Sequence, residues 1–174
     1  MRLTRGWTQR RIPERPTLQV AIIGGLAATS LMTPVAYVSA LQPLDFAAML
    51  GSLVTGETTV SVSGAWLAGM LLHFVNGSLV FPAVYAFVLY PVLPGRPWLK
   101  GATYGVALWA LAQALVMPLA GMGFFSQGAP RPMAALAWSL GSHLLYGLVL
   151  GALVAPWLVR FIEEEEREVQ RRAA

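Results

Sequence analysis

The sequence predicts an all-α membrane protein with four spanning helices, and its composition is the first reason. Of its 174 residues, 56% are hydrophobic and only 11% are charged, whereas an ordinary soluble domain carries about 25% charged residues. The second reason is the position of the charges. Between residues 18 and 159 they are confined to breaks rich in proline, glycine, serine or threonine, at Asp45, Glu57, Arg96, Lys100 and Arg131.

Four apolar stretches, the third reason, are each long enough to cross a bilayer. They lie at about residues 18–41, 64–91, 101–125 and 133–159, and a spanning helix needs about 20 mostly apolar residues. Within lipid the backbone must satisfy its own hydrogen bonds, which favours helices. Barrel strands would instead show alternating hydrophobicity over about ten residues. We therefore expect one transmembrane domain at residues 18–159.

The basic residues predict that both termini face the cytoplasm of a prokaryotic inner membrane. Four spans place residues 1–17, the connection with Arg96 and Lys100, and residues 160–174 on one side. That side carries eleven of the twelve lysines and arginines, and only Arg131 lies opposite. Positive residues accumulate on the cytoplasmic side of membrane proteins. We expect a basic N-terminal segment and a charged C-terminal tail, the tail being helical because its Glu and Arg residues recur at i,i+3 and i,i+4 spacing.

The connection between the first two spans is longer than a turn and holds a short apolar segment at residues 44–54. Asp45 follows Pro43 and has the side chain expected of a helix N-cap. We expect a short helix that either lies in the outer interface or dips into the protein. The sequence leaves these two placements open.

The four segments also indicate that a helical hairpin was duplicated. The first and third each hold a methionine close before a proline, at Met32 and Met117, and the second and fourth each hold His-x-x-x-Gly, from His73 and His143. Two spans per unit would make a parallel repeat, with a pseudo-two-fold axis along the membrane normal. This symmetry places the two histidines at similar depth. They converge only if the second and fourth helices face each other.

Small residues recur every four positions on three of the predicted helices, beside the candidate ligands. Such faces let membrane helices approach closely, and polar side chains within a span usually face the protein interior. The candidate cofactor contacts are His73 and His143, with Gln113 and Trp109 as weaker ones. The candidate packing residues are Gly69, Gly77, Gly101, Gly105, Gly147 and Gly151.

The residue types exclude or disfavour several classes of chemistry. Cysteine is absent, so disulfides, thiolate metal sites and cysteine nucleophiles are excluded. No paired carboxylates or Ser/His/Asp set can be assembled, so we expect the protein not to be an enzyme. No acidic or basic residue lies in the core of a span, which disfavours an ion-coupled transporter. No basic stripe alternates with aromatic residues, as nucleic-acid binding would require.

Three interpretations of the histidines remain open. In the first, each ring hydrogen-bonds a neighbouring helix and serves packing alone. In the second, His73 and His143 hold a b-type haem between two helices, with glycines allowing close approach of the porphyrin. In the third, a quinone or lipid receives a hydrogen bond from a histidine or Gln113, with a tryptophan such as Trp109 packing on its ring. No metal beyond haem iron is expected, because two histidines without carboxylates make a weak metal site.

Three short motifs in the apolar part are shared with a known group of proteins. They are His73 with Gly77, Met117–Pro118 followed by Gly121, and Ser142–His143 with Tyr146–Gly147. With their context over about residues 20–154, they resemble a family of small prokaryotic four-helix membrane proteins, a domain of unknown function. The resemblance implies four spans and no particular activity.

From the sequence we expect an integral membrane protein with a structural or accessory role in a larger membrane complex, of the respiratory or photosynthetic kind. Its partners would be the lipid bilayer and other integral membrane proteins, or further copies of itself. The alternative is an electron-transfer protein that binds haem b or quinone through His73 and His143. A second alternative is an oligomeric small transporter or channel.

Overall fold

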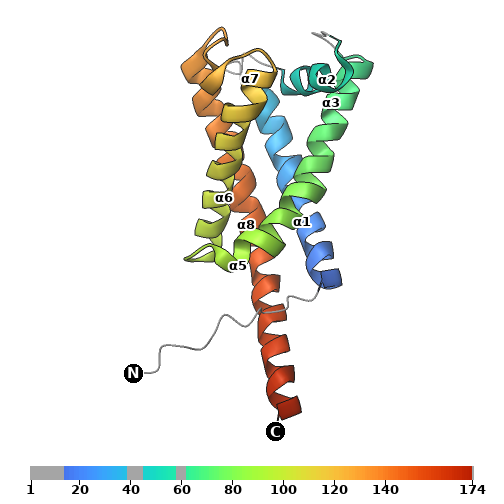
Figure 1. Cartoon of the computed structure of the whole chain (residues 1–174), viewed down its shortest axis with the longest axis vertical. Helices are drawn as coiled ribbons and strands as arrows, with labels where there is room; N and C mark the ends of the chain where they lie inside the picture. Colours follow the sequence, from blue (N-terminus) through green and yellow to red (C-terminus); the bar gives the residue numbers. More distant parts are fainter. Residues whose placement is uncertain (1–13, 39–44, 58–61, 174) are drawn as a thin grey trace.

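The computed structural model describes residues 14–38, 45–57 and 62–173, and every regular element within these residues is a helix. The expectations for residues 1–13, 39–44 and 174 lie outside this part of the chain. Four of the described helices are long and apolar enough to cross a membrane: Pro16–Tyr37, Gly64–Val92, Pro97–Leu119 and Pro132–Ala173. The prediction of an all-α protein with four helices of spanning length is confirmed (Figure 1).

Two of the four spanning helices are interrupted by π-helical turns. The second consists of α3 Gly64–Val75, η1 Asn76–Val80, α4 Phe81–Val84, η2 Tyr85–Leu89 and α5 Tyr90–Val92. The third consists of α6 Pro97–Leu111, η3 Ala112–Val116 and α7 Met117–Leu119. The first spanning helix is α1 Glu14–Val38 and the fourth is α8 Pro132–Ala173, each continuous despite an internal proline.

Proline explains where the π-turns fall. After each π-turn, one residue intervenes before a proline, at Pro82, Pro91 and Pro118. Proline lacks an N–H, and its ring clashes with the carbonyl four residues earlier. The preceding turn widens, and the residue before the proline donates to a carbonyl five positions back, as the Phe81 N–H does to Asn76. Two of these wider turns, η1 and η3, contribute residues to the cavity described below.

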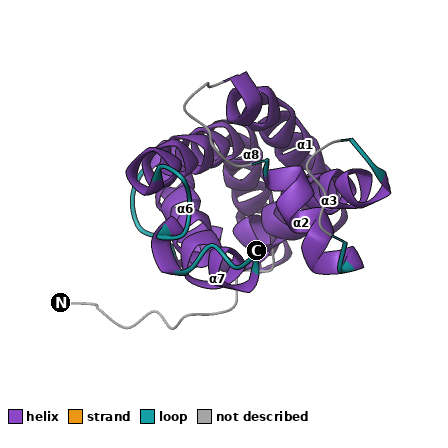
Figure 2. Ribbon diagram, turned by 90° about the horizontal axis from the view of Figure 1, so that it is seen from above, coloured by secondary structure: helices purple, strands orange, loops and turns teal. Residues whose placement is uncertain are grey.

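The spanning helices follow one another around the bundle in the order α6, α8, α1 and then the second spanning helix (Figure 2). Thus α8 packs against both α6 and α1, and α1 packs against η1 and α4. The second and third spanning helices meet near α5, where the Tyr104 hydroxyl donates to the Phe81 carbonyl at 2.8 Å and the Tyr104 ring stacks on Tyr85. Toward the opposite end these two helices diverge (Figure 1).

The six candidate packing glycines all lie where a neighbouring helix approaches closely. At the crossing of α6 and α8, a Cβ on Gly101, Gly105, Gly147 or Gly151 would meet backbone atoms of the other helix. Gly77 faces the Thr29 side chain of α1, and Gly69 faces the backbone of the short helix α2 Phe46–Thr55. Close approach at these positions therefore depends on the absence of a side chain.

The apolar segment predicted at residues 44–54 forms α2, which lies across the end of the bundle where α3 begins (Figure 1). Its close approach to α3 places it against the protein, and three of its residues line the internal cavity. Asp45 is its N-cap, as expected: Oδ1 accepts hydrogen bonds from the Ala47 and Ala48 N–H groups. The same carboxylate accepts from the Tyr37 hydroxyl of α1 and the Trp66 indole of α3, so it joins three helices.

Replacing Asp45 with alanine is expected to loosen α2 by about 1 kcal/mol, because loss of an N-cap side chain typically costs that much. Hydrogen exchange of the α2 amides should therefore quicken about fivefold in the variant. Asp45→Asn is the matched control, because asparagine caps helices as well as aspartate does. Equal loss of protection in both variants would contradict the capping role and assign the effect to the charge.

Two predicted helix ends need correction. The third spanning helix ends at Leu119 rather than at about residue 125, because Pro118 removes a donor and Gly121 and Gly123 both adopt positive φ, which ends a helix. The first begins at Glu14 rather than at residue 18, because a proline such as Pro16 is tolerated in a first helical turn.

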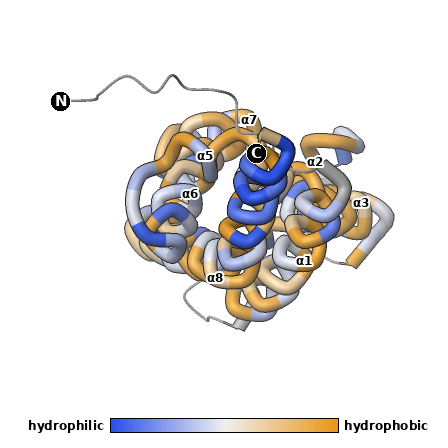
Figure 3. Tube along the Cα trace, turned by 90° about the horizontal axis from the view of Figure 1, so that it is seen from below, coloured by the Kyte–Doolittle hydropathy of each residue, from blue (hydrophilic) through white to orange (hydrophobic). Residues whose placement is uncertain are grey.

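The charged residues 160–173 extend α8 without a break, and this end of the helix is hydrophilic (Figure 3). The start of α1, the connection between α5 and α6, and the end of α8 all lie at one end of the bundle (Figure 1). An even number of spans requires this arrangement. The cytoplasmic placement of that end and the internal repeat stay predictions.

Candidate functional site

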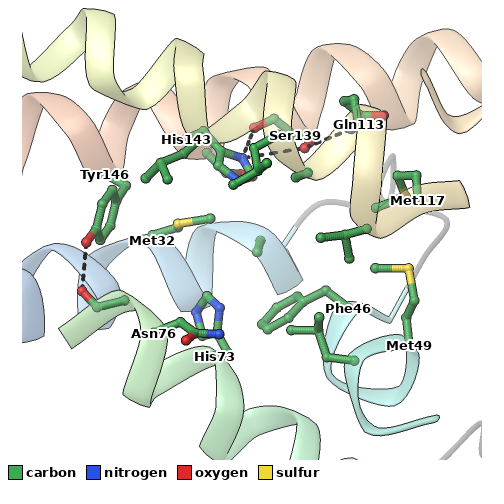
Figure 4. Close-up of a pocket in the computed structure, with 18 of the residues that line it drawn as sticks. Met32, Phe46, Met49, His73, Asn76, Gln113, Met117, Ser139, His143 and Tyr146 are labelled. Carbon is green, nitrogen blue, oxygen red and sulfur yellow. Dashed lines mark hydrogen bonds between the residues drawn. The ribbon is translucent and has the colours of Figure 1, made fainter. Parts of the chain in front are cut away.

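An internal cavity of about 190 Å³ lies between the spanning helices. Residues from all four spanning helices, from α2 and from the short helix η4 Phe124–Ser126 line it. Most of the lining is apolar, and the polar members of the lining are Thr29, His73, Asn76, Gln113, Ser126, Ser139, Ser142, His143 and Tyr146. Both histidines of the sequence therefore face one space, from opposite sides (Figure 4).

His143, on α8, has its Nδ1 at 2.8 Å from the carbonyl oxygen of Ser139, one turn earlier. A carbonyl oxygen only accepts, so Nδ1 carries the hydrogen and Nε2 of the neutral ring has a free lone pair. The backbone bond also fixes the orientation of the ring, as it does for many ligand-binding histidines. His143 is thus held as a hydrogen-bond acceptor or ligand.

His73, on α3, has the opposite tautomer. Its Nε2 lies 3.1 Å from the hydroxyl of Thr33, and that hydroxyl donates its only hydrogen to the Thr29 carbonyl at 2.7 Å. The imidazole must therefore donate from Nε2, which leaves Nδ1 with a free lone pair. The Phe46 ring of α2 packs on the imidazole, with ring centroids 4.7 Å apart. Contacts from α1 and α2 together hold His73 beside the cavity.

Gln113, in η3, is buried and forms hydrogen bonds through both ends of its amide. Its Oε1 accepts from the Ser126 hydroxyl at 2.7 Å, and its Nε2 donates to the Ser139 hydroxyl at 3.2 Å. Ser126 and its neighbour Phe125 have positive φ, a costly conformation for residues other than glycine. Gln113 therefore ties the strained connection after α7 to α8, close to His143.

Trp109 is the one cofactor candidate that does not line the cavity. Its indole N–H lies 3.3 Å from the Leu136 carbonyl of α8, and its ring packs against Phe125. It shares a helix face with Gln113, but its long side chain leans on the neighbouring helix. The expected stacking of this ring on a ligand in the cavity is not what the structure places there.

Sequence reasoning missed several residues of the site. Met32, Met49 and Met117 line the cavity, and so does Thr29, whose hydroxyl is buried and has no hydrogen-bond partner among the described residues. Met32 and Met117 were visible as part of the suggested repeat, but nothing marked them as cavity residues. Asn76 carried a signal, as one of the few amides within a span.

Four apolar helices of spanning length around a cavity with polar groups define a multi-pass helical membrane protein. The chain belongs to DUF6789, a family of unknown function, whose model matches residues 16–160. This agrees with the resemblance to a family of unknown function that the sequence motifs indicated. Comparisons with curated proteins and with solved structures found no match.

Proposed function

We propose that this protein binds a small lipophilic molecule with one six-membered ring, of the quinone class, between its spanning helices. The observation that supports this proposal is that both histidines, one from α3 and one from α8, line one cavity. Each has one nitrogen committed to the protein and one with a free lone pair. Pockets of membrane and soluble proteins commonly combine an apolar lining with a few such polar groups.

The size of the cavity favours a single ring over haem. An engineered protein cavity of about 150 Å³ binds benzene, so about 190 Å³ accommodates one substituted six-membered ring. A haem macrocycle of four pyrrole rings is several times larger and would require the helices to separate. Axial haem ligation would also use different nitrogens on the two histidines, Nδ1 of His73 and Nε2 of His143. The haem alternative is therefore the weaker of the two cofactor proposals.

The accessory role in a larger membrane complex is a second proposal that rests on surface alone. Large apolar side chains such as Ile23, Leu71 and Leu119 are more than half exposed on the outer faces of the helices. Lipid contact accounts for these faces without a protein partner, so they do not distinguish the two environments. Recovery of the same membrane partner in repeated mild-detergent purifications would support the accessory role.

A pair of adjacent substitutions tests ligand binding. Val116 lines the cavity, whereas its neighbour Leu115 is half exposed on the outer face. Val116→Phe should fill the space that the ring would occupy and weaken binding at least tenfold, and Leu115→Phe should leave it unchanged. The probes are 2,6-dimethyl-1,4-benzoquinone and its hydroquinone, added without oxygen to protein in lipid nanodiscs, and binding is measured by calorimetry.

Two outcomes would contradict the proposal. If neither probe binds the wild-type protein, the cavity has no role for this ligand class. If both variants weaken binding equally, the probes partition into lipid or bind elsewhere. A visible spectrum of protein purified with supplied haem tests the alternative, because a Soret band lost in both His73→Ala and His143→Ala would favour haem ligation.

A further inference from the structure

We infer that the cavity selects the reduced, hydroxyl-bearing form of such a ring, a hydroquinone, over the oxidised quinone; this rests on the proposed function. The reason is the hydrogen-bond polarity of the lining. A quinone offers only carbonyl acceptors, whereas a hydroquinone offers two hydroxyl donors. The protein groups that face the ligand must complement one or the other.

The two histidines present acceptors, and their tautomers cannot easily change. For His143 to donate from Nε2, Nδ1 would have to give up its hydrogen bond to the Ser139 carbonyl. For His73 to donate from Nδ1, Nε2 would lose its bond to Thr33, whose hydrogen is already used. A lone pair left facing a carbonyl oxygen repels it, and a buried acceptor without a donor is costly.

Two hydroxyl groups in the lining have the same polarity. The Ser142 hydroxyl donates its hydrogen to the Trp138 carbonyl at 3.1 Å, and the Tyr146 hydroxyl donates to the Gly77 carbonyl at 2.7 Å. Both oxygens can only accept from a further group. Asn76 and Thr29 also line the cavity, but an amide and a hydroxyl can pair with either form and do not discriminate.

The preference can be measured with three ring compounds of nearly equal shape. They are 2,6-dimethylhydroquinone, 2,6-dimethyl-1,4-benzoquinone and the dimethyl ether of the hydroquinone, which keeps both oxygens but has no donor. We expect the hydroquinone to bind the wild-type protein at least tenfold more tightly than the other two, because a site built for hydrogen bonds rejects analogues that lack them. For a bound two-electron couple, tenfold tighter binding of the reduced form raises the midpoint potential by about 30 mV.

A histidine variant assigns the preference to its acceptor. His143→Phe should reduce the hydroquinone's advantage at least fivefold, while Trp109→Phe, outside the cavity, should retain it. The comparison of the three compounds on wild-type protein needs no variant, so a folding defect in His143→Phe would leave the inference testable.

The outcomes separate this inference from the proposed function. Equal affinity for the three compounds, or tighter binding of the quinone, would overturn the selectivity and leave ring binding in the cavity intact. Absence of binding by all three would overturn the proposed function itself. Retention of the full preference by His143→Phe would overturn the role of this histidine as the acceptor.

Discussion

Replacing Gly147 with leucine is expected to destabilise the bundle by about 3 kcal/mol or more. A Cβ at this position would meet backbone atoms of Gly101 and Gly105 on α6, which cannot move aside unless the two helices separate. Overpacking of a core typically costs about 1–3 kcal/mol, and a rigid backbone neighbour places this site at or above the upper limit. Thermal unfolding in detergent, followed by circular dichroism, would measure the loss.

Gly141→Leu is the matched control, because it makes the same substitution on the same helix. A Cβ on Gly141 meets nothing within 4 Å, and leucine is the better helix former by a few tenths to about 1 kcal/mol. This variant should therefore unfold at the wild-type temperature or above it. A similar loss in both variants would show that contact between α6 and α8 is not what requires glycine.

Replacing Tyr146 with phenylalanine is expected to cost about 2 kcal/mol, through one carbonyl group in the second spanning helix. The Phe81 N–H, the ordinary partner of the Gly77 carbonyl, donates to Asn76 instead, and Pro82 has no N–H to offer. The Tyr146 hydroxyl donates to that carbonyl at 2.7 Å. Without it a buried acceptor loses this donor, a loss that costs about 1–3 kcal/mol.

Tyr85→Phe removes the same atom from another buried tyrosine and should have the opposite effect. The Tyr85 hydroxyl is buried and has no hydrogen-bond partner among the described residues. Its removal relieves a desolvated polar group, so we expect a neutral result or a gain of up to about 1 kcal/mol. Unfolding temperatures measured side by side would contradict the explanation if the two variants were equally destabilised.

Much of the fold could be predicted because it depends on local properties of the chain. The second and fourth spanning helices begin within one residue of where their apolar runs begin, and Asp45 caps α2 as its position after Pro43 indicates. The end of the third helix was predicted too late, because an apolar run continues past Leu119. Proline and two glycines with positive φ decide that end, and a hydropathy pattern does not register them.

The π-turns are an intermediate case. Each precedes a proline that is visible in the sequence, yet Pro34 and Pro156 lie within helices that contain no such turn in the described residues. A carbonyl that loses its helical donor near a proline needs a new one. At Gly77 that donor is Tyr146 of another helix, so the tertiary contact and the wider turn occur together.

By itself the sequence determined the number and position of the apolar helices, because a bilayer imposes length and composition on each span separately. It also identified the two histidines as unusual. Only the tertiary structure decided that His73 and His143 share a cavity, that Gln113 is used within the protein, and that Trp109 lies outside the site. These outcomes depend on which helix faces meet and on which ring nitrogen finds a partner. Such contacts join residues far apart in the chain, so no local pattern specifies them.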